Sequence, residues 1–177
     1  MTTPREQLLN SLRDAHAMEK QAETMLKGQA KRLEHYPELR ARIEQHVEET
    51  RGQAELVSQC LEHLGESPSK IKDSGGSMLA MGQSLAGMVV DDEVLKGIIA
   101  CYSFEHMEIA SYRQLIAMAQ AVGEPEVQRI CEQILPEEEA MAAWLEQRMD
   151  GITEEFMMRL GMPPDARPGA SRAEAKR

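Results

Sequence analysis

The two halves of this chain carry the same pattern of glutamates. Glu108 and Glu138 lie 89 residues after Glu19 and Glu49, respectively. The segment Glu105-His106-Met107 before Glu108 also resembles the one before Glu19. A proline-containing turn separates the two glutamates of each half. Each half therefore predicts a helical hairpin with one glutamate on each helix at matched depth, and two such hairpins predict a four-helix bundle.

The predicted inner faces of these helices are apolar except near their middle. Apolar residues recur at alternating steps of three and four, which is the spacing of a buried helical stripe. On the third helix we expect Glu105 on the stripe and Glu108 at its edge, and on the second the stripe passes either Glu49 or Thr50. The carboxylates and the imidazole that interrupt the four stripes are Glu19, His46, Glu49, Glu105, Glu108 and Glu138.

Carboxylates at the centre of a bundle need compensation, because a buried charge must find a cation or take up a proton. No Lys or Arg occupies the stripe positions. Converging glutamates hold a pair of metal ions in ferritin-like proteins. We therefore expect an all-α, ferritin-like four-helix bundle with two metal ions bound by these six residues. Carboxylate and imidazole ligands suit iron or manganese, and also zinc.

The histidines leave part of the ligand set open. In the common di-metal pattern a His follows a Glu by three residues, but here those positions after Glu49 and Glu138 are Gly52 and Met141. His46 precedes Glu49 by three residues, and His16 precedes Glu19 in the same way, so each pair shares a helix face. Either histidine can act as a ligand or support one by hydrogen bonding.

Periodicity divides the chain into one domain, residues 1–161, and a tail, residues 162–177, which we expect to be disordered. Helices are expected over about 4–33, 37–64, 91–122 and 125–149, with Thr3 capping the first. Residues 78–88 predict a short extra helix in the crossover connection. Asp150-Gly151 predicts a stop, followed by a last short helix over 152–160.

Composition excludes several classes of function. The net charge of −10 disfavours nucleic acid as a partner, and no apolar run is long enough to cross a membrane. The chain begins without the apolar run of a secretion signal, and its three cysteines form no C-x-x-C pair. We therefore expect a cytoplasmic protein with free thiols and no rubredoxin-type iron centre. Any redox activity would then need an external electron donor.

Four segments resemble the YciE/YciF-like family of bacterial stress proteins. They begin at Leu12, His46, Glu105 and Leu135, and Glu105-His106-Met107-Glu108-Ile109-Ala110-Ser111-Tyr112 is the most specific. The similarity covers about residues 5–150. It implies a ferritin-like bundle with an extra short helix, usually dimeric, and a di-metal centre. The family is associated with stress responses, and its reaction is poorly defined.

The leading functional hypothesis is a di-iron or di-manganese protein that handles peroxide, oxygen or iron under stress, as a possible di-metal oxidoreductase. The alternatives are a non-catalytic metal-binding module and a structural dimeric helical bundle. We also expect a homodimer, because the segments Met78–Met88 and Phe156–Met158 offer apolar surface that one bundle does not bury.

Overall fold

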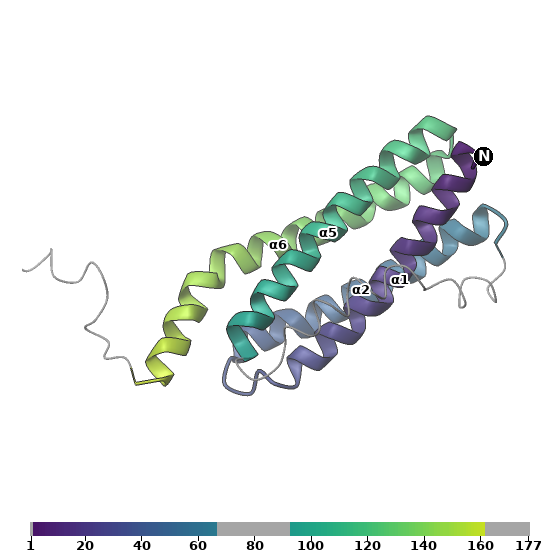
Figure 1. Ribbon diagram of the computed structural model, residues 1–177. Coiled ribbons are helices and arrows are strands. Elements are labelled where there is room, and N and C mark those ends of the chain that lie inside the picture. Colours follow the sequence, from purple (N-terminus) through teal and green to yellow (C-terminus); the bar gives the residue numbers. More distant parts are fainter. Residues whose placement is uncertain (1, 67–92, 162–177) are drawn as a thin grey trace, which may run out of the picture.

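The computed structural model describes residues 2–66 and 93–161, and these form four helices and no strand. Helices α1 (Pro4–Ala30) and α2 (Pro37–His63) make the first hairpin, and α5 (Glu93–Val122) and α6 (Pro125–Arg159) make the second (Figure 1). Each helix packs most extensively on its hairpin partner. The predicted all-α four-helix bundle is confirmed. The predicted short helix at 78–88 and the tail at 162–177 lie outside the described residues.

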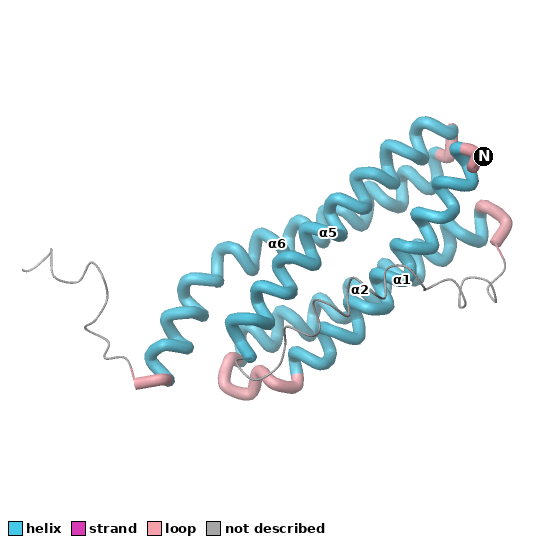
Figure 2. Tube along the Cα trace, viewed as in Figure 1, coloured by secondary structure: helices cyan, strands magenta, loops and turns pink. Residues whose placement is uncertain are grey.

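The two hairpin turns lie at opposite ends of the bundle (Figure 2). At one end Arg5, near the start of α1, pairs with Glu124 in the α5–α6 turn at 3.3 Å. At the other end the Arg159 guanidinium of α6 donates to the backbone carbonyl of His35 at 2.9 Å. Consequently α2 ends and α5 begins at opposite ends, which requires the long crossover connection found in ferritin-like bundles.

Local sequence signals determine most of the helix ends. The amide of Glu6 donates to the Thr3 hydroxyl at 3.2 Å, and the Thr3 amide donates to the Glu6 carboxylate at 2.7 Å, so the predicted cap is confirmed. Gly65 ends α2 with a φ of 94°, and Gly123 makes the second turn with a φ of 77°. Helix α1 ends at Ala30, three residues earlier than expected.

The inner stripes of α1 and α6 match the prediction, with Glu19 and Glu138 both fully buried. On α2 the stripe passes Thr50, which is 1 % exposed. On α5 the buried stripe is rotated from the predicted one, because Glu108 lies at its centre rather than its edge and is 1 % exposed. Helix α5 carries apolar residues on several of its faces, so periodicity alone could not determine which face is turned inward.

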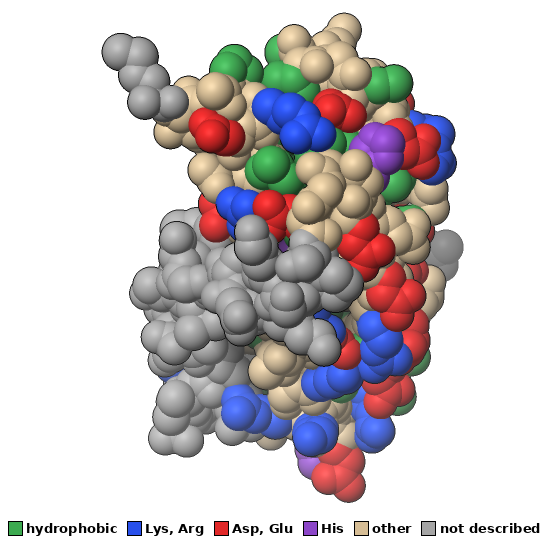
Figure 3. Space-filling model, turned by 90° about the vertical axis from the view of Figure 1, so that its right-hand side faces the viewer, with side chains coloured by type: hydrophobic (Ala, Val, Ile, Leu, Met, Phe, Trp, Pro, Cys, Tyr) green, Lys and Arg blue, Asp and Glu red, His purple; other side chains and the backbone are tan. Residues whose placement is uncertain are grey.

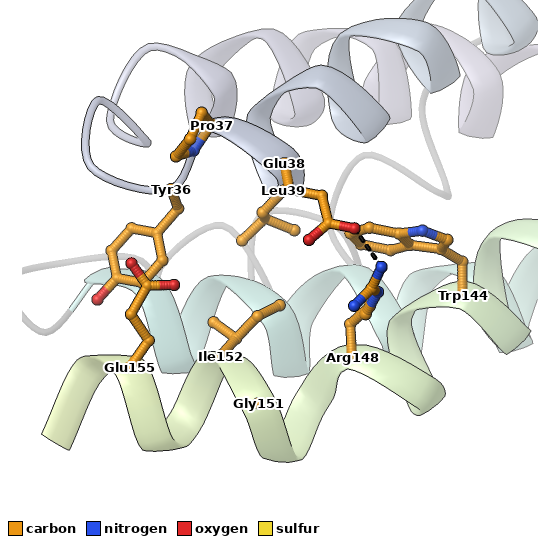
Figure 4. A pocket seen from close by; sticks show the side chains of 9 residues that line it. All are labelled: Tyr36, Pro37, Glu38, Leu39, Trp144, Arg148, Gly151, Ile152 and Glu155. Carbon is orange, nitrogen blue, oxygen red and sulfur yellow. Dashed lines mark hydrogen bonds and ion pairs between the residues drawn. The ribbon is translucent and has the colours of Figure 1, made fainter. Parts of the chain in front are cut away.

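Helix α6 continues through Gly151 to Arg159, so the predicted stop at Asp150-Gly151 was wrong. The continued helix forms one wall of a hollow of about 380 Å³. Figure 4 shows Ile152 and Glu155 of this wall facing Tyr36 and Leu39 at the start of α2. Ile152 is 9 % exposed, Arg148 pairs with Glu38, and the Arg159 guanidinium lies 5.2 Å from the centre of the Tyr36 ring. These tertiary contacts outweigh the roughly 1 kcal/mol that glycine costs inside a helix.

Replacing Gly151 with Ala should stabilise the protein by about 0.5–1 kcal/mol, because alanine is a better helix former and its Cβ would meet no atom within 4 Å. Gly123→Ala should destabilise by about 1 kcal/mol, because its φ of 77° disfavours any side chain. Urea unfolding of both variants checks this. A loss of stability in Gly151→Ala would mean that the helix is broken there.

One carboxylate binds three cations and is joined to α2 by one of them. Glu23 is 8 % exposed and bonds Lys20 and Lys27 of its own helix and Arg51 of α2, the last at 3.1 Å. These partners lower the pKa of Glu23 to about 2. Elsewhere on the surface, basic and acidic side chains also lie interspersed (Figure 3). On the face that Figure 3 shows, the negative charge is therefore partly matched locally by basic side chains.

The Glu23→Gln variant should lose about 1 kcal/mol of stability at pH 7. Because folding lowers the pKa of Glu23 from 4.5 to about 2, its contribution is complete above pH 4.5 and disappears as the pH falls towards 2. The difference between wild type and variant in urea unfolding should therefore shrink between pH 6 and pH 3. Glu139→Gln, at an exposed pair with Arg113, should differ little from wild type at either pH.

Candidate metal centre

A cluster of ionisable side chains interrupts the apolar core in the middle of the bundle. His46 of α2, Glu105 of α5 and Glu138 of α6 each offer one ligand atom, and these three atoms lie within 4.8 Å of one another. The Nε2 atom of His46 lies 3.0 Å from Glu105 Oε2 and 3.5 Å from Glu138 Oε2. All three residues are 1 % exposed or less. Three helices thus bring an imidazole and two carboxylates to one dry point.

Glu19 of α1 and Glu108 of α5 extend this cluster. Both are 1 % exposed or less, and the charge of Glu138 acts on both. The hydroxyl of the fully buried Tyr112 donates a hydrogen bond to Glu19 Oε1. The five members of this buried cluster are Glu19, His46, Glu105, Glu108 and Glu138.

Burial favours the protonated forms of Glu19, Glu105 and Glu108 when no cation is present. Desolvation, followed by repulsion from Glu138, raises the pKa values of Glu19 and Glu108 well above 4.5. Desolvation also raises the pKa of Glu105 to about 7, although His46 opposes the shift. The side chains can therefore pack together in the metal-free protein because part of their charge is neutralised by protons.

His46 supplies positive charge to the metal-free cluster. Burial lowers its pKa, but the carboxylates of Glu105, Glu138 and Glu49 outweigh burial and raise the pKa to about 12. His46 is therefore an imidazolium at neutral pH. A metal ion binding at Nε2 would have to displace that proton, because a metal-bound imidazole nitrogen carries none.

Glu49 lies at the outer edge of the cluster. Its Oε2 atom is 2.7 Å from Nδ1 of His46 and 3.0 Å from the Arg42 guanidinium, and Gln45 donates to its Oε1 at 2.8 Å. Its side chain is 22 % exposed, and these partners, His46 first, lower its pKa to about 2. In this arrangement Glu49 orients the His46 ring from behind, as carboxylates commonly orient metal-binding histidines. That Glu49 binds metal directly stays a prediction.

The buried cluster fits a pair of metal ions because several of its polar atoms have no hydrogen-bond partner. Within the described residues, Oε2 of Glu19, Oε2 of Glu105, Oε1 of Glu108 and both carboxylate oxygens of Glu138 are buried without a hydrogen-bond partner. Nε2 of His46 is also unpartnered, because it is close to Glu105 but not aligned with it. Buried polar atoms are normally satisfied. Carboxylate oxygens and one imidazole nitrogen form a donor set suited to iron or manganese.

The other histidines lie away from the cluster. His16 is half-buried, and desolvation lowers its pKa. His106 is exposed and stacks edge-on against Tyr102, with 4.5 Å between ring centres. His35 and His63 are exposed. Of the two histidines that the sequence left open, the structure therefore brings only His46 into the cluster.

Two supporting contacts are absent from the sequence prediction. The Tyr112 hydroxyl of α5 donates to Glu19, which lies on a different helix 93 residues away. Arg42 pairs with Glu49 from two turns earlier on α2. The Arg42–Glu49 contact could be predicted from the spacing on α2, whereas the Tyr112–Glu19 contact depends on how α1 and α5 pack.

The chain belongs to the DUF892 family, a domain of unknown function, whose family model matches residues 3–158. It is similar to a crystal structure of a protein from Xanthomonas campestris, at 46 % identity, with a TM-score of 0.76 and coverage of 90 % of this chain and 99 % of that one. The E. coli stress protein YciF matches at 27 % identity and a TM-score of 0.70, covering 92 % and 100 % of the two chains. YcfI from Rhodopseudomonas palustris matches at 27 % identity and a TM-score of 0.66, covering 81 % and 93 %. The family predicted from the four segments is confirmed.

Proposed function

We propose that this chain binds two metal ions, iron or manganese, within its buried cluster. The observation that carries the proposal is the convergence of His46, Glu105 and Glu138 within 4.8 Å, in the buried core and among unpartnered carboxylate oxygens. Five carboxylates and one imidazole form the proposed set: Glu19, His46, Glu49, Glu105, Glu108 and Glu138. On binding, a metal pair would displace protons held by Glu19, Glu105, Glu108 and His46 in the metal-free protein.

Each residue has a distinct part in this proposal. Glu105, Glu108 and Glu138 present unpartnered oxygens to the metal pair from α5 and α6. Tyr112 holds one oxygen of Glu19 and leaves the other free. Glu49 holds Nδ1 of His46, which directs Nε2 inward. Once bound, a carboxylate-held metal pair supplies Lewis-acid and redox chemistry at oxygen species.

The leading activity is the handling of peroxide, oxygen or iron during stress. It is supported by the proposed donor set and by the similarity to a bacterial protein named as a stress protein. The apolar core around the cluster would keep bulk water away from the metal pair. The three cysteines are free and buried, and the sequence holds no C-x-x-C pair for an iron centre. Turnover would therefore require an external electron donor.

A non-catalytic metal-binding module is the principal alternative, and a structural dimeric bundle is the other. The two metal-binding hypotheses differ in one observable, the turnover of hydrogen peroxide by protein loaded with iron or manganese. Catalysis requires turnover above that of the free metal, whereas a storage or binding module needs only stoichiometric binding. The structural hypothesis requires neither.

Adding iron(II) or manganese(II) to chelator-treated protein should raise its melting temperature. A metal that binds only the folded state stabilises it by about 2.7 kcal/mol at a hundredfold excess over the dissociation constant. Glu138→Ala and Glu108→Ala should abolish this gain, because each removes unpartnered carboxylate oxygens from the proposed ligand set. Thermal melts with chelator and with each metal, alongside metal analysis of the purified protein, measure both effects.

The matched control is Glu139→Ala, because Glu139 adjoins Glu138 on α6 but points outward and is 44 % exposed. It should keep the full metal-dependent rise. The proposal fails if wild type shows no rise with either metal, or if Glu139→Ala loses the rise as Glu138→Ala does.

We also propose a cytoplasmic homodimer without nucleic-acid or membrane partners. None of the described helices combines the length and apolar character needed to span a bilayer. The burial of three free cysteines, whose pKa values desolvation raises, suits a reducing compartment. Near the end of α6, Met157, Met158 and Leu160 are 39 %, 36 % and 70 % exposed. Such apolar surface favours contact with a second copy.

Light scattering should give the mass of a dimer at micromolar concentration. Replacing Met157 and Met158 with Lys should shift the mass towards the monomer if this end of α6 lies in the interface, because a buried interface depletes charge. Wild type that is monomeric throughout, or that forms a shell of many subunits, would contradict the proposal.

A further inference from the structure

A hollow of about 320 Å³ lies on the surface between α2 and α6, directly outside the buried cluster. Four carboxylates line it, and neither Lys nor Arg does among the described residues. Two of them have arginine partners outside the lining, Arg51 on Glu48 and Arg42 on Glu49. The lining consists of Glu48, Glu49, Gly52, Gln53, Glu55, Leu56, Gln59, Gln133 and Glu137. We refer to it as the α2–α6 hollow.

Gln53 gives this hollow an unsatisfied polar group. The residue is 1 % exposed although it lines the hollow, and its amide nitrogen donates to Glu137 Oε2 at 2.9 Å. Its amide oxygen is buried and has no hydrogen-bond partner within the described residues. A buried carbonyl oxygen without a donor normally has a water or a cation beside it. An amide oxygen among carboxylates is a suitable group for a hydrated divalent cation.

Glu49 connects the hollow to the buried cluster. It lines the hollow with a side chain that is 22 % exposed, and the same carboxylate lies 2.7 Å from His46 Nδ1. Of the six proposed ligands, the other five are 1 % exposed or less. Glu137, which also lines the hollow, is followed directly by Glu138 of the cluster. The hollow is therefore where the cluster comes closest to solvent through residues of its own set.

Gly52 leaves space in the wall of the hollow. It lies one turn after Glu49, where the common di-metal pattern has a histidine, and a Cβ there would meet no atom within 4 Å. A glycine inside a helix costs roughly 1 kcal/mol relative to alanine. The missing side chain keeps the wall open beside Glu49 and Gln53.

We propose that the α2–α6 hollow is the port through which hydrated divalent cations reach the buried cluster, with Glu49 as the residue that passes them inward. This inference rests on the proposed metal site. Glu55 and Glu137 attract the cation, since clustered charge of one sign raises the rate of capture of the opposite charge. The Gln53 amide oxygen takes the place of water as the cation is dehydrated. Glu49 then breaks its ion pair with Arg42 and moves inward with the cation.

The test follows uptake of cobalt(II) by chelator-treated full-length protein, using the visible absorption that cobalt(II) gains when protein ligands replace water. In stopped-flow mixing, the double variant Glu55→Gln/Glu137→Gln should slow the second-order rate roughly threefold to tenfold and make it less sensitive to salt. The equilibrium amount of bound cobalt(II) and its spectrum should stay as in wild type. The control is Glu62→Gln/Glu132→Gln, which removes one exposed carboxylate from each of the same two helices outside the hollow.

A second variant blocks the port without changing charge. Gly52→Leu should fill the open wall and slow both uptake and chelator-driven release by similar factors, so that the dissociation constant is unchanged. A merely structural disturbance would change affinity instead. Gly28→Leu is the matched control, because Gly28 also lies in a helix with no atom within 4 Å of a built Cβ, but on α1 away from the hollow.

The outcomes separate this inference from the proposal on which it rests. Uptake by wild type with unchanged rates in both the charge and the Gly52→Leu variants overturns the port alone. Equal slowing in the two control variants also overturns it. The absence of any cobalt(II) uptake by wild type overturns the port together with the metal site.

Discussion

The cost of burying several carboxylates at one level of a bundle governs the rest of this structure. Glu19, Glu105, Glu108 and Glu138 share a dry space, and each would be strongly destabilising if it stayed charged and alone. Without metal, this cost is reduced by the raised pKa values of Glu19, Glu105 and Glu108 and by the positive charge of His46. With metal, the same oxygens would become ligands. Proton uptake and metal binding are thus two solutions to one electrostatic problem.

The hydrogen bonds of Tyr112 and Glu49 hold side chains of the cluster in position. Tyr112 fixes one oxygen of Glu19 from the neighbouring hairpin, and Glu49 fixes the outer nitrogen of His46. The apolar residues above and below this level fill the bundle and supply most of its stability. A polar layer can persist in the core because the free energy gained by burying the apolar layers offsets the cost of burying the polar layer between them.

The position of Glu49 shows how the two hairpins depart from symmetry. Its counterpart in the second half, Glu138, is fully buried, whereas Glu49 is partly exposed and paired with Arg42. His46 and Thr50 occupy the inner face of α2 instead. Of the six proposed ligands only Glu49 is partly exposed, and it lines the hollow between α2 and α6.

The sequence by itself determined the helical hairpins, the inner faces of α1 and α6, the cap at Thr3 and four of the buried carboxylates, Glu19, Glu105, Glu108 and Glu138. Helical period and capping are local properties, so they can be read without knowing what packs against what. Tertiary structure alone decided the rotation of α5, the choice of Thr50 over Glu49, the continuation of α6 past Gly151 and the pairing of Tyr112 with Glu19. Each of these depends on contacts between helices far apart in the chain, whose free energies exceed the local preferences that the sequence displays.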